Sequence, residues 1–275
     1  MQLLIGCDFS SAPSQRKNIV VATGVLSGQR VVVSSLRRFS TLDDWGAWLR
    51  ATPSWVGAFD FPFGLPRELV EHLGWPKLWP ALIDHYAALS RAEIQRTFAA
   101  FCAARPAGRK FAHRATDGPA DSSPSMKWVN PPVAYMLHAG VPRLMAAQAS
   151  FPGLHEPHPQ SARVALEGYP GMLAREVIGR RSYKSDDTSQ QTDARRRARQ
   201  DLLAELERGA TRLALSLTLT DSLRLELVSD ARGDGLDAVL CLLQAAWGVQ
   251  RAGNGPPGYG LPANMDPLEG WIVTA

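Results

Sequence analysis

Short apolar runs that stop at an acidic residue recur along the chain. Each run is followed by a turn or loop containing glycine or proline. Runs with these boundaries predict buried β-strands, because a helix needs a longer pattern with a period near 3.6 residues. The three clearest cases are residues 3–7 before Asp8, residues 55–59 before Asp60, and residues 164–166 before Glu167.

The acidic residues at these strand ends predict a metal site. If the strands run parallel, their carboxyl ends meet at one edge of the sheet, where ligands of open α/β folds bind. Neighbouring carboxylates repel one another unless a cation neutralises them. A fourth acidic site, Asp234 with Asp237, opens the apolar stretch 238–247. The pattern therefore predicts that a divalent metal ion binds here.

The first 60 residues predict the order β-β-β-α-β. Residues 18–26 and 30–39 are rich in β-branched side chains, and the short link between them is typical of an antiparallel hairpin. Thr41, with Asp44 three residues later, predicts the N-cap of a helix. The strand at 55–59 follows, and we expect it to lie beside the opening strand.

The segment 66–150 predicts a helical insertion within a single domain of residues 1–275. Apolar residues recur at helical spacing on both sides of a polar stretch rich in glycine and proline. The last helical pattern, residues 134–149, contains Pro142, which predicts a break in that helix. Strand signals resume afterwards, so we interpret the segment as an insertion and not as an independent domain.

The rest of the chain predicts further helices around one ambiguous stretch. One helix is expected from Met172, a charged one over residues 192–207, and a last one from Asp234. Residues 213–227 fit two interpretations. Their alternation of apolar and polar residues favours a strand, whereas Thr220 followed by an aspartate is typical of a helix cap.

Composition narrows the class of protein. The 275 residues are 45% hydrophobic and 20% charged, which is typical of a globular chain that buries a substantial core. The net charge of +4 is compatible with a polyanionic partner such as nucleic acid. Three widely spaced cysteines argue against structural disulfides and a cysteine-bound zinc ion. No leader-like or membrane-spanning pattern occurs, so we expect a cytoplasmic protein without a membrane partner.

Several motifs resemble the ribonuclease-H-like superfamily. They are Gly-Cys-Asp-Phe-Ser at 6–10, Phe-Asp-Phe-Pro-Phe-Gly-Leu-Pro at 59–66, Leu-Glu-Gly-Tyr-Pro at 166–170 and Gly-Asp-Gly-Leu-Asp-Ala at 233–238. More narrowly, the chain resembles the bacterial and archaeal predicted-nuclease family called domain of unknown function 429. That likeness extends to residues 113–117, 183–186 and 269–272, and so covers nearly the whole chain.

This resemblance implies an α/β fold with a mixed five-stranded sheet flanked by helices, and places the helical insertion after the fourth strand. It also implies a metal-dependent nuclease that hydrolyses the phosphodiester bonds of nucleic acid. The residues that match the additional motifs are the candidates for substrate binding: His113, Arg114, Asp117 and Lys184.

The carboxylates suit a mechanism with two metal ions. Two Mg²⁺ or Mn²⁺ ions about 3.5–4 Å apart clamp the attacking and leaving oxygens, and such hard cations take oxygen ligands. Asp8 on the central strand is the expected bridging ligand, with Asp60 and Glu167 each favouring one side. Asp237 would close the cage from the last helix, as a fourth catalytic carboxylate. Asp234 lies three residues earlier on the same helix face and is a further candidate ligand, which looks like the Asp-x-x-Asp of RuvC-type junction resolvases.

Each acid also has a purely structural interpretation. Asp234 and Asp237 would stabilise the first turn of the helix that they open. Asp237 lies among apolar residues, however, where a carboxylate needs a partner. Asp8 and Asp60 would serve as turn formers after their strands, and Glu167 would be an ordinary exposed acid.

The basic and aromatic candidates have alternatives as well. The arginines of residues 195–199 form either a solvated, salt-bridged helix face or a phosphate contact. Lys184 would bind a phosphate as a point charge, or pair with one of the two aspartates that follow it. His113 would position water or donate a proton, or else lie on the surface. The tryptophans have two interpretations, packing in the core or stacking on the bases of a nucleic acid. They are Trp45, Trp48, Trp75 and Trp79.

Two other classes of function are open from the sequence. A phosphotransferase or ATPase of the actin-like branch shares the core strands, and residues 8–11 resemble its first phosphate loop. The chain lacks the duplicated core with paired glycine-rich loops that this class requires. The other class is a non-catalytic nucleic-acid-binding or scaffold protein, which a measurement of metal affinity would distinguish from a nuclease.

The oligomeric state is a separate expectation. A resolvase-like mode requires two active sites and therefore a homodimer.

Overall fold

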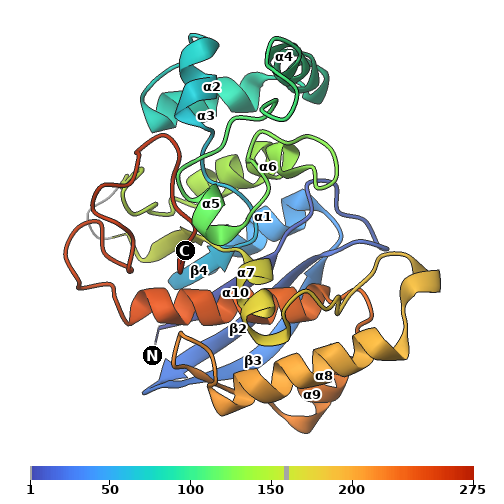
Figure 1. Ribbon diagram of the computed structural model, residues 1–275. Helices are drawn as coiled ribbons and strands as arrows, with labels where there is room; N and C mark the ends of the chain where they lie inside the picture. The colour runs from blue at the N-terminus through green and yellow to red at the C-terminus, as the bar shows by residue number, and fades with distance from the viewer. Residues whose placement is uncertain (1, 158–160) are drawn as a thin grey trace.

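The chain folds around a mixed six-stranded β-sheet with helices on both faces, as the computed structural model shows for residues 2–157 and 161–275 (Figure 1). β2 runs antiparallel to β1 and to β3, whereas β4 lies parallel to β1 and to β5, and β6 lies parallel to β3. This arrangement is consistent with a ribonuclease-H-like topology. In spatial order the strands are β5 (Arg163–Glu167), β4 (Trp55–Phe59), β1 (Leu4–Asp8), β2 (Ile19–Ser27), β3 (Arg30–Phe39) and β6 (Ser216–Thr218).

The expected sheet of five strands was therefore one strand too small. The sixth, β6, is only three residues long and pairs parallel with the start of β3. It is followed at once by α9 (Asp221–Ser229), whose N-cap Thr220 accepts a hydrogen bond from the amide of Leu223 at 3.3 Å. Both interpretations of residues 213–227 are thus confirmed, because the stretch contains a strand and then a capped helix.

The predicted order of the first 60 residues is confirmed. The hairpin of β2 and β3 precedes α1 (Leu42–Ala51), and β4 pairs with β1. Thr41 caps α1 by accepting a hydrogen bond from the amide of Asp44 at 3.1 Å. The two parallel strands that precede Asp8 and Asp60 are therefore direct neighbours.

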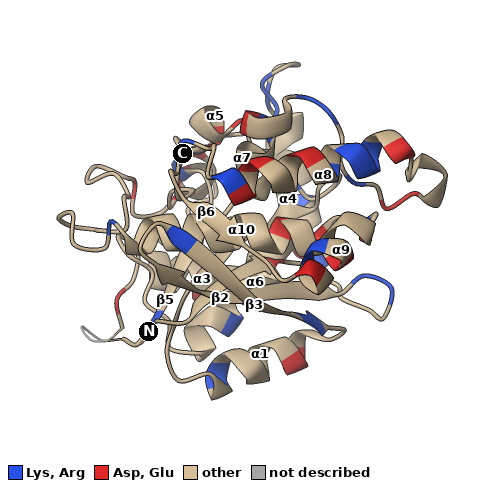
Figure 2. Ribbon diagram, turned by 90° about the horizontal axis from the view of Figure 1, so that it is seen from below, with Lys and Arg blue, Asp and Glu red and all other residues tan. Residues whose placement is uncertain are grey.

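Four helices cover one face of the sheet. Their buried side chains form one apolar cluster with alternate residues of the strands, such as Leu4, Val56 and Leu166. In Figure 2 the charged residues gather on α8 and α9, while α10 carries acidic residues only in its first turn. Besides α9, the helices of this face are α7 (Pro170–Ile178), α8 (Asp193–Arg208) and α10 (Asp234–Val249).

The opposite face is covered by α1 and by the helices of residues 66–150. Their buried residues share a second apolar cluster with the other alternate strand residues, among them Ile5 and Phe59. Trp45 and Trp79 belong to this core, and Trp48 and Trp75 pack against it. The helices between β4 and β5 are α2 (Arg67–His72), α3 (Trp79–Ala88), α4 (Arg91–Ala103), α5 (Asp117–Ala120) and α6 (Val133–Ala146).

The break predicted at Pro142 does not occur, since α6 runs through it. A proline inside a helix removes one backbone hydrogen bond and crowds the preceding turn. Here the neighbouring Val141 and Leu144 are fully buried in the core, and their burial holds the helix together across the proline.

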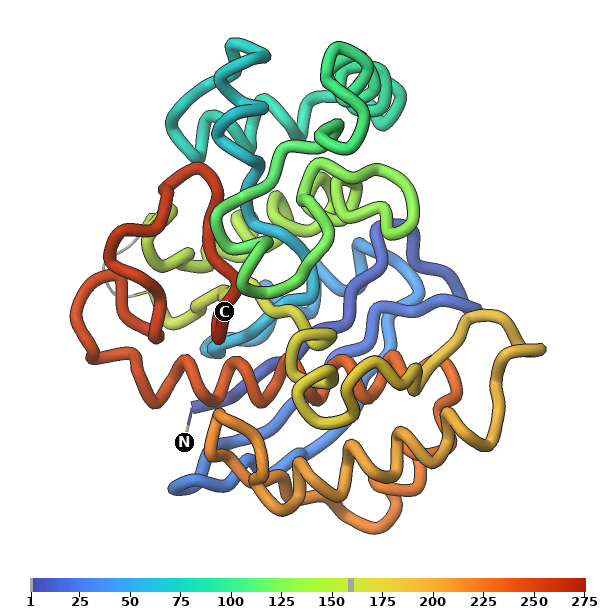
Figure 3. Tube along the Cα trace, viewed as in Figure 1, coloured from blue at the N-terminus to red at the C-terminus, as the bar shows by residue number. Residues whose placement is uncertain are grey.

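After α10 the chain returns to the sheet, as the red end of the tube in Figure 3 shows. Ile272 forms a parallel bridge with Glu167 at the open edge of β5. No helix in residues 2–157 and 161–275 is both long and apolar enough to cross a bilayer.

Candidate metal centre

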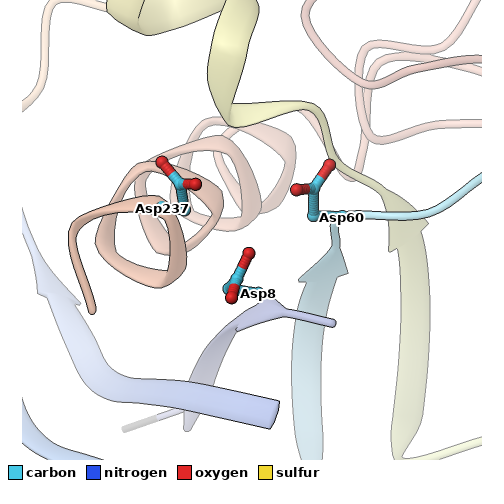
Figure 4. Close-up of side chains that lie close together, drawn as sticks. All are labelled: Asp8, Asp60 and Asp237. Atoms are coloured by element: carbon cyan, nitrogen blue, oxygen red, sulfur yellow. The ribbon is translucent and has the colours of Figure 1, made fainter. Parts of the chain in front are cut away.

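Three aspartates from different elements meet at the carboxyl end of the central strands. Asp8 is the last residue of β1, Asp60 follows β4, and Asp237 lies in the first turn of α10. One carboxylate oxygen from each lies within 4.8 Å of those of the other two. The side chains surround a common space in Figure 4. The structure thus brings together three of the five predicted metal ligands.

Strand alternation explains why Asp8 and Asp60 face α10. Side chains along a strand alternate between the two faces of the sheet. Leu4 belongs to the apolar cluster on the α10 face, so Asp8, four residues later, points the same way. The same count from Val56 places Asp60 on that face as well. Because Cys7 pairs with Phe59, Asp8 and Asp60 end their strands at the same level.

Glu167 points to the other face of the sheet. It pairs with Phe59, so it lies one residue short of the level of Asp8 and Asp60. The residue that reaches that level is Gly168, immediately after β5, and it has no side chain to offer. The prediction grouped Glu167 with the aspartates because all three acids end apolar runs. A register difference of one residue turns its side chain away, and within the described residues the acidic group does not include it.

Glu167 instead forms a buried ion pair with Arg114. The guanidinium donates to both carboxylate oxygens, at 2.7 and 2.8 Å, and also to Asp117 at 3.0 Å. The amide of Phe63 donates to Glu167 at 2.9 Å. Burial raises the pKa of Glu167, and Arg114 opposes this rise. Arg114 and Asp117, which were predicted to contact substrate, are therefore enclosed and paired with each other, and His113 beside them is exposed.

Asp234 lies close to the three aspartates without joining them. Burial, followed by the charges of Asp230 and Asp237, raises the pKa of Asp234 to about 6. The start of α10 is capped by a different acid, because the amide of Gly235 donates to Asp230 at 2.9 Å. Asp234 and Asp237 do lie in the first turn of α10, as predicted, but the acid that accepts a hydrogen bond from a first-turn amide is Asp230, which the sequence pattern did not single out.

Asp237 is held by two neighbouring side chains of the segment before α8. Its side chain is completely buried; the hydroxyl of Tyr183 donates to one carboxylate oxygen and the ammonium of Lys184 to the other. Burial by itself would lower the pKa of Lys184, but Asp237, Tyr183 and Asp8 raise it well above its usual value. Lys184 thus remains charged and contacts the acidic group directly. Tyr183 was missed, although it belongs to the motif that drew attention to Lys184.

The electrostatics of the three aspartates favour a cation. Burial, followed by the negative charge of Asp237, raises the pKa of Asp60 to about 7, although Lys184 acts against it. The same two causes raise the pKa of Asp8 well above its usual range. A divalent ion would relieve both desolvation and repulsion. Three carboxylate donors of this kind fit Mg²⁺ or Mn²⁺, which prefer oxygen ligands.

A cavity of about 590 Å³ opens beside the aspartates. Asp8, Asp60 and Lys184 line one side, and residues of α6 line another. Two of the residues that line the cavity contact each other, since the Arg91 guanidinium lies 5.0 Å from the ring centre of Tyr135. The sequence pattern gave no reason to choose the other basic residues of the cavity, because they are isolated in the sequence and come from separate segments: Lys17, Arg91 and Arg232.

The arginine-rich part of α8 does not form one uniform surface. Arg199 is buried and donates to the carbonyls of Val228 and Tyr183, at 2.9 and 2.7 Å. Neither a solvated role nor a phosphate contact describes this residue. Its function in the fold is to fasten the segment that carries Tyr183 and Lys184.

Comparisons of the chain with protein-family models, with curated proteins and with solved structures found no match.

Proposed function

We propose that the protein is a metal-dependent nuclease that hydrolyses phosphodiester bonds at the three aspartates. The observation that carries the proposal is the convergence of Asp8, Asp60 and Asp237 beside a cavity that is also lined by basic side chains. The motif resemblance to predicted nucleases supports the same reaction.

The proposed chemistry assigns a distinct task to each aspartate. Bound Mg²⁺ or Mn²⁺ would lower the pKa of a water molecule and stabilise the charge that develops on the phosphate. Asp8, between the other two, would hold a cation together with Asp60. Asp237 would supply oxygen ligands for the second ion of a two-ion mechanism when the substrate arrives. Tyr183 orients the carboxylate of Asp237.

The cavity supports a polyanionic substrate. Lys17, Arg91 and Arg232 line it from three separate segments, and Lys184 reaches it from a fourth. Phosphate groups are attracted by such dispersed positive charge without any sequence preference. Basic side chains beside the aspartates would let the backbone of a nucleic acid approach while a cation offsets the acidic charge.

The first test is Mn²⁺ binding by titration calorimetry, on the wild-type protein and on the Asp8→Asn/Asp60→Asn variant. We expect binding by the wild type and none by the variant. Asp84→Asn is the control, because Asp84 is an exposed residue of α3 that belongs neither to the acidic group nor to the lining of the cavity. An equal affinity in all three proteins would contradict the proposed ligands.

The second test separates a nuclease from the other classes. The protein with Mn²⁺ bound is incubated separately with single-stranded DNA, duplex DNA, RNA, a branched DNA junction and ATP. Cleavage of a nucleic acid that requires Asp8 supports the proposal. ATP hydrolysis alone would indicate the actin-like alternative, and metal binding without any turnover would indicate a scaffold.

A further inference from the structure

The ammonium of Lys184 lies within the proposed metal centre. It contacts one carboxylate oxygen of Asp237, and the hydroxyl of Tyr183 contacts the other. Both oxygens of this predicted ligand are therefore already bound by donors of the chain itself. Asp8 and Asp60 also lie within the electrostatic reach of Lys184, and no protein donor binds their carboxylate oxygens within the described part of the chain.

The backbone aims Lys184 at Asp237. Arg199 donates to the carbonyl of Tyr183 at 2.7 Å, and the amide of Ser185 donates to the carbonyl of Ala231 at 3.1 Å. These two hydrogen bonds fasten the chain on both sides of Lys184. Gly233 leaves room for it, because a Cβ there would come within 2.8 Å of the Lys184 Cβ. The position of the ammonium thus follows from a built arrangement of the backbone.

The charges set a limit on the number of ions. With a metal ion bound to the carboxylates, the three aspartates and one lysine carry a formal net charge of two negatives, which a single divalent cation balances. A second divalent ion would give the group an excess of positive charge and would have to compete with Lys184 for Asp237. Like charges at such short range disfavour one another strongly in a partly buried site.

We propose that Lys184 acts as a built-in cation, so that the substrate-free protein holds one divalent ion on Asp8 and Asp60 while Asp237 remains bound to the lysine. This inference rests on the proposed metal centre and specifies how many ions it takes. The Lys184 side chain is 42% exposed on the cavity side, whereas that of Asp237 is fully buried. The lysine therefore closes the metal centre from the direction in which substrate arrives.

The test counts Mn²⁺ ions by titration calorimetry and by electron paramagnetic resonance, without substrate. We expect one ion in the wild type and two in Lys184→Met, with a spin-coupled signal in the variant only. The first ion should also bind about tenfold more tightly to the variant, because a nearby positive charge has been removed. Lys184→Arg should behave as the wild type, since it keeps the charge.

A matched control comes from a lysine outside the cavity. Lys77→Met also removes one lysine charge, but Lys77 is paired with Glu71 at 3.5 Å and does not contact the three aspartates. It should bind one ion with wild-type affinity. Lys184→Gln provides a second neutral variant if Lys184→Met folds poorly, as judged by circular dichroism and thermal unfolding.

The possible outcomes separate the two proposals. Two ions in the wild type would overturn the role of Lys184 and leave the metal centre standing. One ion with unchanged affinity in both neutral Lys184 variants would do the same. No Mn²⁺ binding in either the wild type or the neutral variants would overturn the metal centre and, with it, the role of Lys184.

Discussion

Gly6 of β1 lies directly against Ala238 of α10, so close that a Cβ on Gly6 would come within 2.0 Å of the Ala238 carbonyl oxygen. Asp8 lies two residues beyond Gly6, and Asp237 immediately precedes Ala238. The absence of a side chain at position 6 therefore lets the strand and the helix approach closely enough for their two carboxylates to meet.

Substitution Gly6→Ala tests this relationship. The added methyl group would clash with backbone atoms of α10, which can move only if the helix moves. We expect a loss of about 3 kcal/mol or more in the free energy of unfolding, and weaker Mn²⁺ binding because Asp8 and Asp237 separate. Urea denaturation and calorimetry measure the two effects. Gly253→Ala is the control, since a Cβ there meets nothing within 4 Å; equal stability of both variants would refute the explanation.

The aspartates of the proposed metal centre should be essential for the proposed cleavage reaction. Asp8→Asn and Asp237→Asn each replace a carboxylate by an amide of the same shape, so the fold should persist while Mn²⁺-dependent cleavage falls by about 100-fold or more. Asp234→Asn should lose less activity, because Asp234 lies outside the group of three. Initial rates on whichever nucleic acid is cleaved provide the measurement. Wild-type rates in Asp8→Asn or Asp237→Asn would remove that residue from the catalytic set.

Metal affinity should depend on pH around neutrality. The pKa of Asp60 is raised to about 7 by burial and by the charge of Asp237. Below that pH the carboxyl holds a proton that a metal ion must displace, and above it the carboxylate is free. Affinity should therefore rise with pH between about 6 and 8, by up to tenfold per unit for each proton displaced. Titrations in buffers of different ionisation enthalpy count the protons; an affinity that does not change with pH would contradict the prediction.

The buried pair of Arg114 and Glu167 should stabilise the fold. Arg114→Met leaves the Glu167 carboxylate buried without its partner, so the free energy of unfolding should fall by about 3–5 kcal/mol at pH 7. Arg181→Met is the control: Arg181 pairs with Asp201 at 2.7 Å, both side chains are more than half exposed, and about 1 kcal/mol or less is expected. A similar loss of unfolding free energy in both variants would indicate that burial of the Arg114–Glu167 pair adds nothing to stability.

Glu167→Gln separates a structural role from a metal-binding role. If Glu167 serves Arg114, as its hydrogen bonds indicate, the variant should lose stability and still bind Mn²⁺ with wild-type affinity. Calorimetry on the folded variant measures this at a temperature well below its unfolding transition. Loss of Mn²⁺ binding in the folded variant would instead make Glu167 a ligand, as the sequence pattern predicted.

Much of the architecture could be predicted from the sequence because it depends on local patterns. Apolar runs bounded by glycine and proline mark β1, β4 and β5, and Thr41 and Thr220 mark the starts of two helices. Asp8, Asp60 and Asp237 were also identified in advance. Each of them stands at the end of a strand or the start of a helix, where a short stretch of sequence already shows the position.

The partners of these acids were decided only by the tertiary structure. Glu167 ends an apolar run just as Asp60 does, yet the pairing of β4 with β5 places it one residue short and turns it toward Arg114. Lys184 and Tyr183 reach Asp237 across more than fifty residues of chain. Sequence determines which side chains a strand end can offer, because that depends on neighbouring residues. Strand register and long-range packing determine which of them meet, since a shift of one residue exchanges the two faces of a sheet.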